Sequence, residues 1–183
     1  MQPWNTLHRQ TVLYTGPFLT VEMHHVQLPD GRILSDWPWI ITPDFINILV
    51  ETDEGLYPIF RQTKYAVEGE TLAPVGGYIE PGEDPLTAAQ RELREELGCE
   101  ALDWVPLGQY AIDGNRGNGT AHLFLARKAR RVAEPCADDL EEQEIALLNR
   151  AALEEALDSG QFRVVPWATV VALGLRAIDR AGS

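Results

Sequence analysis

The chain of 183 residues has only two cysteines, Cys99 and Cys136, and neither belongs to a C-x-x-C pair. This scarcity argues against a disulfide framework and a zinc knuckle, so a reducing cytoplasm is the expected location. The sequence also lacks an apolar run long enough to span a membrane and an N-terminal apolar segment preceded by basic residues. We therefore expect neither a membrane span nor a signal peptide.

Positive charge is scarce as well, because 15 Lys and Arg stand against 28 Asp and Glu, which gives a net charge of −13. Binding to a nucleic-acid backbone depends on phosphate neutralisation by Lys and Arg, so nucleic acid is not the expected partner. A small phosphorylated ligand remains compatible, since a bound metal ion inverts the local field. There are no internal repeats and no low-complexity linkers.

The most informative stretch runs from Gly77 to Cys99. Asp84 followed by Pro85 is a typical helix start, and Gly98 favours a helix stop. Apolar residues recur between them at helical spacing, at Leu86, Ala89, Leu93 and Leu97. The pattern predicts a helix from about Pro85 to Leu97, preceded by a tight loop from Gly76 to Glu83.

Three carboxylates gather on this helix. At roughly 100° per residue, Glu92 and Glu96 lie one turn apart on the same flank, with Glu95 a little further round. Like charges at this spacing destabilise a helix, and a hard divalent cation would relieve the repulsion. Mg²⁺ prefers oxygen ligands, keeps several waters and binds substrate phosphates. For an isolated pair of glutamates, a solvated acidic face would be the ordinary explanation.

The glutamates belong to a longer pattern, G-x5-E-x7-R-E-L-x-E-E-x-G-C. A chance match is on the order of 10⁻⁸ per position. Its fixed positions are Gly77, Glu83, Arg91, Glu92, Leu93, Glu95, Glu96 and Gly98. This pattern resembles the Nudix box, the signature of the Nudix hydrolases. Cys99 stands where that family usually has an aliphatic residue, and it is small and apolar enough to pack there.

The resemblance implies hydrolysis of a nucleoside diphosphate linked to another group, assisted by Mg²⁺, with Mn²⁺ as the alternative ion. It assigns the metal ligands to Glu92 and Glu96, then Glu95, with the carbonyl of Gly76 as a backbone ligand. Three further residues complete the box in a supporting role. Gly77 and Glu83 orient it, and Arg91 pairs with a box glutamate.

A general base is expected outside the box, on a late acidic loop, as in the ADP-ribose pyrophosphatase branch of the family. A carboxylate that binds metal is a poor base because its lone pairs are committed. Four candidates lie on that loop, namely Asp139, Glu141, Glu142 and Glu144. We place Glu142 first and Glu141 second.

Three other segments carry candidate substrate contacts. Trp37 and Trp39 share one face of an expected strand, and either pack in the core or stack on a nucleobase of this or a neighbouring subunit. Arg61 either forms a surface salt bridge or holds a diphosphate or terminal ribose. Arg116 lies in the glycine-rich loop 114–119, which is either a flexible hairpin tip or a binding loop.

Strand and helix signals alternate along the rest of the chain. We expect coil over 1–16, a hairpin of strands 18–28 and 32–41, and a second hairpin of strands 45–52 and 55–65 around Asp53-Glu54-Gly55. Strands follow at 104–113, 120–130 and 145–149, a short helix at 150–160, and a C-terminal helix at 166–178. This order indicates an α/β fold.

The family resemblance narrows the fold to an α/β/α sandwich around a mixed sheet. Residues 1–42 would form a small antiparallel β extension and residues 43–183 the Nudix hydrolase domain. The extension and the tail 141–175 are similar to those of the ADP-ribose pyrophosphatase branch, which often forms homodimers. Two segments depart from that branch. After the box, DGNRGNGT stands where the branch has a loop containing Pro-Gly. Before the box, APVGG stands where the branch has LPAGG.

Together these patterns predict a Mg²⁺-dependent pyrophosphatase acting on ADP-ribose or a related nucleoside diphosphate sugar. One alternative is a Nudix hydrolase of another nucleotide, such as a dinucleotide cofactor or a nucleoside triphosphate. The other is a non-catalytic Nudix domain that senses a nucleotide. The apolar N-terminal hairpin, which carries Trp37, Trp39, Ile40 and Ile41, predicts a homodimer through about residues 15–45.

Overall fold

The computed structural model describes residues 1–136 and 142–182. The chain divides into two compact units. The first contains Met1–Asp44 and Tyr110–Ala121, and the second contains Phe45–Gln109 and His122–Ser183. Within the described ranges, no helix is long and apolar enough to cross a membrane.

The first unit is built on three antiparallel strands, β1 (Asn5–Tyr14), β2 (Thr20–Gln27) and β3 (Ile33–Ile41). The predicted hairpin of residues 18–41 is confirmed. The prediction of coil over 1–16 was wrong, because β1 pairs with β2 over most of its length. Every residue of β1 is exposed, so its sequence carries no alternation of burial from which a strand could be inferred.

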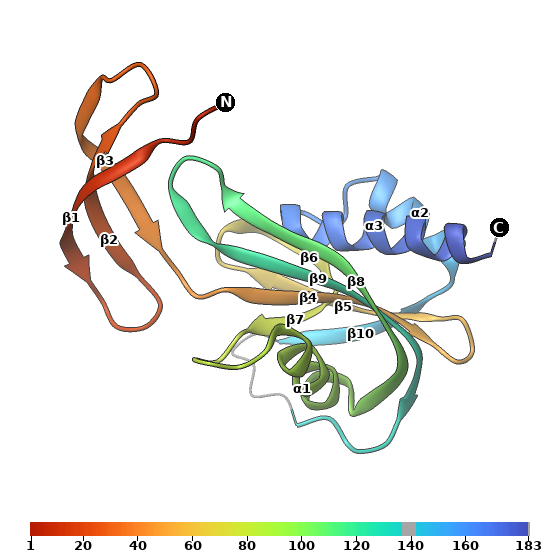
Figure 1. Ribbon diagram of the computed structural model, residues 1–183. Helices are drawn as coiled ribbons and strands as arrows, with labels where there is room; N and C mark the ends of the chain where they lie inside the picture. The colour runs from red at the N-terminus through yellow and green to blue at the C-terminus, as the bar shows by residue number, and fades with distance from the viewer. Residues whose placement is uncertain (137–141, 183) are drawn as a thin grey trace. The chain divides into compact units, whose positions relative to one another are not determined.

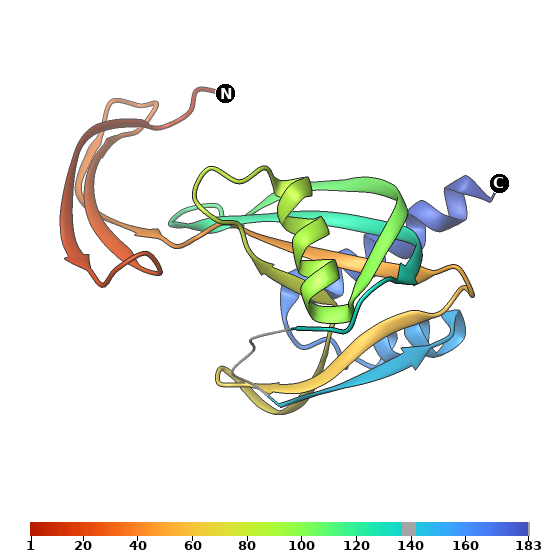
Figure 2. The ribbon, with the colours of Figure 1, turned by 90° about the horizontal axis from the view of Figure 1, so that it is seen from below.

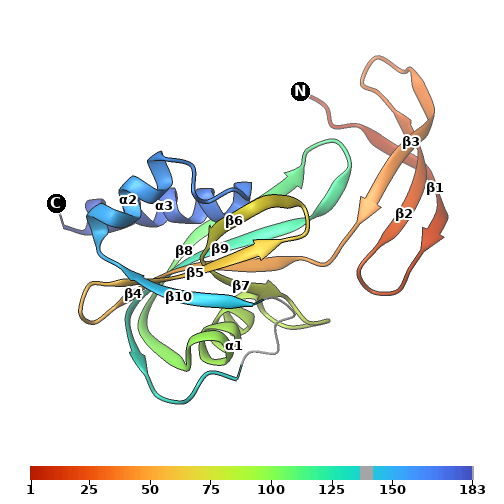
Figure 3. The same ribbon diagram turned by 180° about the vertical axis from the view of Figure 1, so that it is seen from behind.

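The second unit contains two sheets (Figure 1). In one, β4 (Phe45–Thr52) lies between β9 (Gly117–Arg131) and β7 (Val75–Tyr78), and β8 (Cys99–Asp113) pairs with β9. The other has the antiparallel order β10 (Gln143–Leu148), β5 (Tyr57–Lys64), β6 (Val67–Ala73), seen from behind in Figure 3. Both β8 and β9 extend into the first unit, where Ile40 of β3 pairs in parallel with Gly117.

The predicted hairpin at residues 45–65 needs a correction. Its tight turn is present, with the amide of Gly55 donating to the carbonyl of Thr52 at 3.0 Å. Beyond the turn, however, β4 and β5 pair in different sheets. Local turn chemistry therefore fixed the reversal of the chain, but competition from β9, β7, β6 and β10 decided the pairing.

Three helices cover the sheets: α1 (Pro85–Leu97), α2 (Arg150–Asp158) and α3 (Val165–Ala181). Within the second unit, α1 lies on one side of the β4 sheet and α3 on the other (Figures 1 and 2). On the α3 side, a Cβ added to Gly174 would lie 2.5 Å from Leu49 Cδ2, so α3 approaches β4 closely. The mixed sheet between helices confirms the predicted α/β class.

The box helix α1 begins and ends where the sequence predicts. The side chain of Asp84 accepts hydrogen bonds from the amides of Leu86 and Thr87 at 3.1 and 3.2 Å, which satisfies free donors of the first turn. Gly98 has φ 64° and ends the helix in the left-handed conformation. The predicted loop 76–83 was partly wrong, since Val75–Tyr78 forms β7 against β4.

Candidate active site

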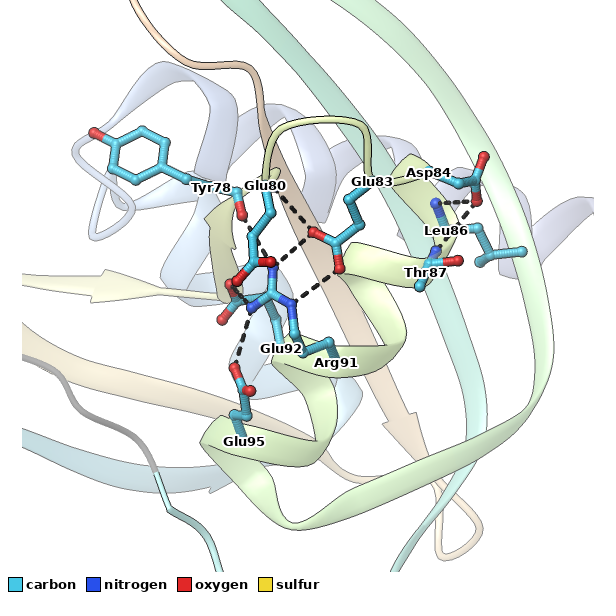
Figure 4. A network of polar contacts seen from close by, with 9 residues as sticks. All are labelled: Tyr78, Glu80, Glu83, Asp84, Leu86, Thr87, Arg91, Glu92 and Glu95. Atoms are coloured by element: carbon cyan, nitrogen blue, oxygen red, sulfur yellow. Dashed lines mark hydrogen bonds and ion pairs between the residues drawn. The ribbon is translucent and has the colours of Figure 1, made fainter. Parts of the chain in front are cut away.

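The guanidinium of Arg91 is the centre of the polar network on α1 (Figure 4). It donates from Nε and Nη2 to both carboxylate oxygens of Glu83, each at 3.0 Å. Its Nη1 donates to Glu92 at 2.8 Å and to Glu95 at 3.1 Å, and Nη2 also reaches the carbonyl of Tyr78 at 3.1 Å. One cation thus connects three box carboxylates to the backbone of β7.

This network favours the ionised form of the Glu83 carboxylate. Hydrogen bonds from Arg91 lower the pKa of Glu83 below its usual value, and the amide of Glu80 adds to the effect, whereas burial opposes it. In return, the bonds to Glu83 raise the pKa of Arg91 above its already high value. The paired geometry is bidentate, which is the strong form of an Arg–carboxylate contact.

The glycine pair of β7 leaves room for two neighbouring side chains. A Cβ on Gly77 would lie 2.1 Å from Glu92 Oε1, and a Cβ on Gly76 would lie 2.1 Å from Asn47 Nδ2. The amide of Gly76 donates to Glu96 Oε2 at 3.3 Å. Both carboxylates are therefore packed against the Gly76–Gly77 backbone, where a side chain at residue 77 would displace Glu92 and one at residue 76 would displace Asn47.

The chemistry of these groups fits a hard divalent cation. Glu92 and Glu96 are mostly buried, and together with the Gly76 carbonyl they offer only oxygen. Glu95 is more exposed, at 42% of its side chain, and bonds to Arg91. Within residues 1–136 and 142–182, no three acidic, His or Cys side chains converge. Two carboxylates completed by water and substrate phosphate are the usual surroundings of Mg²⁺.

A second cluster joins two candidates that are far apart in sequence. Pairing of β10 with β5 places Glu144 opposite Arg61, and a cavity of about 350 Å³ is lined by Arg61, Glu142 and Glu144 among others. Arg61 also has an ion pair with Glu70 at 3.6 Å, in which both side chains are more than half exposed. Candidates Asp139 and Glu141 lie outside the described residues.

The chain that leads toward these acidic residues is attached to α1. The amide of Cys136 donates to the carbonyl of Glu95 at 2.8 Å, so the last residue described before the gap lies against the C-terminal half of the box helix. The amides of Val132 and Ala133 both donate to the carbonyl of Gly98. Backbone bonds therefore anchor residues 132–136 to the end of α1.

An aromatic cavity of about 420 Å³ lies within the first unit and is lined by Trp4, Trp37, Trp39 and His24 among others. Trp4 meets the edge of Trp37 with ring centroids 5.1 Å apart, and His24 stacks on Trp39 at 5.3 Å. Arg116 lies 5.8 Å from the Trp37 ring centre. Two predicted substrate contacts, Trp37 and Trp39, thus line one cavity, and a third, Arg116, lies over the ring of Trp37.

Sequence reasoning missed three residues near these two sites. Trp4 belongs to the segment that had been expected to be coil. His24, expected to be structural or solvated, is 4% exposed, and its Nε2 donates a hydrogen bond to Glu22 Oε2 at 2.8 Å. Asn47 is the one polar residue inside the apolar run FINILV, and that interruption was the available signal.

The fold and the carboxylate helix define the class of protein, a hydrolase of the Nudix type. The family model for the NUDIX domain matches residues 41–168, so the chain belongs to the Nudix family. A second model, the nucleoside diphosphate sugar hydrolase N-terminal domain, matches residues 4–40. The resemblance inferred from the sequence, including that to the ADP-ribose pyrophosphatase branch, is confirmed by these matches and by the relatives below.

Two curated relatives cover most of the chain. An ADP-ribose pyrophosphatase of Bacillus subtilis (strain 168) is 27% identical over 84% of this chain and 81% of its own. A methanol dehydrogenase activator of Bacillus methanolicus is 27% identical over 92% of this chain and 90% of its own. Among solved structures, an ADP compounds hydrolase has a TM-score of 0.83 at 20% identity, covering 100% of this chain and 97% of the other, which shows a common fold.

Proposed function

We propose that this protein is a cytoplasmic, Mg²⁺-dependent pyrophosphatase that hydrolyses the diphosphate linkage of ADP-ribose or a related nucleoside diphosphate sugar. The products are a nucleoside monophosphate and a sugar phosphate. The observation that carries the proposal is the packing of Glu92 and Glu96 against the Gly76–Gly77 backbone. The similarity to an ADP-ribose pyrophosphatase over 84% of the chain supports the substrate class.

In this proposal Glu92, Glu96 and the Gly76 carbonyl hold the cation, with Glu95 as a further ligand. Bound there, Mg²⁺, or Mn²⁺ in its place, supplies neutralisation of the charge on the diphosphate. Arg91 bonds to Glu92 and Glu95, and Glu83 holds Arg91 in place. Groups that orient metal ligands in this way tune metal binding without contacting the ion. Gly77 supplies the space that Glu92 occupies.

Glu142 is the proposed general base, with Glu141 as the second candidate. The base accepts a proton from the attacking water and must reach it directly or through one further water. In support, Glu142 lines the same cavity as Arg61, which we assign to the diphosphate or the terminal ribose. Cys136, which precedes this acidic segment in the sequence, donates its amide to the carbonyl of Glu95 on α1.

The aromatic cavity of the first unit is proposed to bind the nucleobase. Trp37 and Trp39 offer stacking surfaces, and Arg116 adds a cation at the Trp37 ring. Base stacking on aromatic side chains is worth about 1–3 kcal/mol per base. A nucleotide is therefore the proposed small-molecule partner, and neither nucleic acid nor a membrane is required.

We further propose a homodimer formed through the first unit, with about residues 15–45 at the interface. This unit exposes several large apolar side chains on its strands and on the turn between β1 and β2, an arrangement that marks an interaction surface. They include Leu13, Tyr14, Phe18, Ile33 and Ile41. Sedimentation should give about twice the chain mass of 20.4 kDa. A single monomeric species at micromolar concentration would contradict the dimer.

A substrate screen tests the function. The protein with Mg²⁺ is incubated with ADP-ribose, other nucleoside diphosphate sugars, dinucleotide cofactors and nucleoside triphosphates, and the products are separated by chromatography. We expect the highest kcat/KM for ADP-ribose or a nucleoside diphosphate sugar. A preference for dinucleotides or triphosphates would favour the alternative hydrolase. Binding without any turnover, equal in wild type and Glu96→Gln, would favour a nucleotide-sensing domain.

A further inference from the structure

One buried side-chain oxygen near the candidate active site has no hydrogen-bond partner among the residues that the structure describes. Asn47 lies in the middle of β4 and is 4% exposed, and its neighbours Ile46 and Ile48 are fully buried. Among the described residues, its Oδ1 is the buried side-chain atom without a hydrogen bond. Burying an acceptor and leaving it unpaired destabilises a fold, and such an atom calls for an explanation.

An apolar residue would avoid this cost, because the strand around Asn47 is otherwise apolar from Phe45 to Val50. Val or Ile at this position would also suit a buried strand better. Stability of β4 therefore does not explain the asparagine. What distinguishes the position is its neighbour across the sheet, since Asn47 is paired with Gly76 on β7.

The carboxamide occupies the place where a side chain of residue 76 would lie. A Cβ on Gly76 would be 2.1 Å from Asn47 Nδ2 and 2.7 Å from the carbonyl oxygen of Ile46. Successive residues of a strand point to opposite faces, and a Cβ on Gly77 would instead be 2.1 Å from Glu92 Oε1. The Gly76–Gly77 backbone is thus enclosed by Asn47 on one face and Glu92 on the other.

This enclosure continues to the second carboxylate. The amide of Gly76 donates to Glu96 Oε2 at 3.3 Å, while Glu92 is held by Arg91 at 2.8 Å. A shift of the Gly76 peptide toward β4 would lengthen the bond to Glu96 and turn the Gly76 carbonyl. The Asn47 carboxamide and the carbonyl oxygen of Ile46 both lie in the space beside Gly76 into which such a shift would lead.

We propose that Asn47 is a positioning residue, whose planar carboxamide holds the Gly76–Gly77 backbone against Glu92 and Glu96. The unpaired oxygen is the stability cost that accompanies this geometry, as is common where local strain or imperfect packing serves a site. The link to cation binding rests on the proposed function, whereas the positioning of the glycine backbone does not. No atom of Asn47 needs to contact the cation.

The test compares Asn47→Ala and Asn47→Leu with the matched control Val50→Ala. Val50 is 1% exposed on the same strand but lies beyond the β7 pairing, which ends at Ile48. Three quantities are measured on the full chain. They are amide exchange of Gly76 and Gly77 by NMR without metal, Mn²⁺ affinity by electron paramagnetic resonance, and the thermal midpoint.

For both Asn47 variants we expect amide exchange at Gly76 and Gly77 to be at least about tenfold faster and Mn²⁺ affinity at least about tenfold weaker. Their thermal midpoints should stay within about 5 °C of wild type, because the lost contacts are offset by removal of the unpaired oxygen. Val50→Ala should show the opposite pattern, with a lower midpoint but unchanged Mn²⁺ affinity and glycine exchange.

The proposal is overturned if both Asn47 variants retain wild-type glycine exchange, or if Val50→Ala changes exchange and Mn²⁺ affinity as much as they do. If the wild type binds no Mn²⁺ and turns over no nucleotide, the proposed function fails. The exchange comparison still decides whether Asn47 positions the glycine pair in that case. If Asn47→Ala does not fold, Asn47→Leu, which fills more of the site, provides the same measurements.

Discussion

The box helix and the N-terminal sheet show two ways of using side chains. Helix α1 buries Ala88, Ala89, Leu93, Glu96 and Leu97, and its caps and ion pairs all come from within the second unit. In β1 to β3, by contrast, only His24 and Val26 are buried. The side chains of α1 are held in place by contacts within one unit, which suits precise chemistry. The N-terminal sheet instead presents aromatic and apolar surface, which suits binding.

The largest effect should come from the charge of a box carboxylate. Glu96→Gln keeps the shape and the contact with the Gly76 amide but removes a charged ligand, so kcat should fall by about 10³-fold, equivalent to about 4 kcal/mol of transition-state stabilisation. Steady-state kinetics at saturating Mg²⁺ measure the loss. The matched change Glu95→Gln should cost less, since Glu95 is more exposed. Near wild-type turnover of Glu96→Gln would refute its role.

A smaller loss is expected from Arg91→Met, which leaves Glu83, Glu92 and Glu95 without their shared cation. We expect kcat to fall by about 10- to 100-fold, as for groups that orient metal ligands, and the protein to lose about 2–4 kcal/mol of stability. Urea unfolding measures the loss of stability, and steady-state kinetics measure the fall in kcat. Arg94→Met is the control, because its pair with Glu100 is more than half exposed. Equal effects of the two changes would contradict the central role of Arg91.

The N-terminal sheet should affect binding more than chemistry. Trp39→Ala and Trp37→Ala should each raise KM by about tenfold and leave kcat within about twofold, since a lost stacking contact is worth about 1–3 kcal/mol. Trp4→Ala tests whether the cavity extends beyond the two predicted residues. The exposed Tyr65, in the second unit, supplies Tyr65→Ala as a control. A fall in kcat with unchanged KM would contradict the expectation that the N-terminal sheet affects substrate binding rather than the chemical step.

The smallest effect at neutral pH concerns the interior of the second unit. Burial, then the charge of Glu51, raises the pKa of Tyr57 to about 12. The folded state therefore holds the phenolic proton of Tyr57 more tightly than the unfolded state does. Its contribution to the free energy of unfolding is complete below pH about 10 and is lost as the pH rises through about 12. The loss is at most about 3 kcal/mol. Unfolding followed between pH 8 and 12 should show this decline in wild type and a weaker one in Tyr57→Phe.

Local signals in the sequence were sufficient for the box helix. Asp84, Pro85 and Gly98 act through neighbours in the chain, so the ends of α1 were predicted correctly. The same holds for α2 and α3, whose predicted positions agree with the structure within a few residues. The spacing of the glutamates, together with the family resemblance, likewise indicated the candidate metal ligands.

Pairings between distant segments could not be obtained in this way. The strand β1 has no burial pattern, β7 contains two glycines, and β4 parts from β5 after a well-formed turn. In each case the hydrogen-bonding partner lies elsewhere in the chain, and competition among strands decides the outcome. The amino-acid pattern alone predicted the family and the helices, and it indicated the candidate metal ligands. The folded structure was needed to show that Asn47 lies against Gly76, that Arg61 pairs opposite Glu144 across two strands, and that the ring of Trp4 contacts that of Trp37. Close packing of this kind depends on side chains from several elements at once.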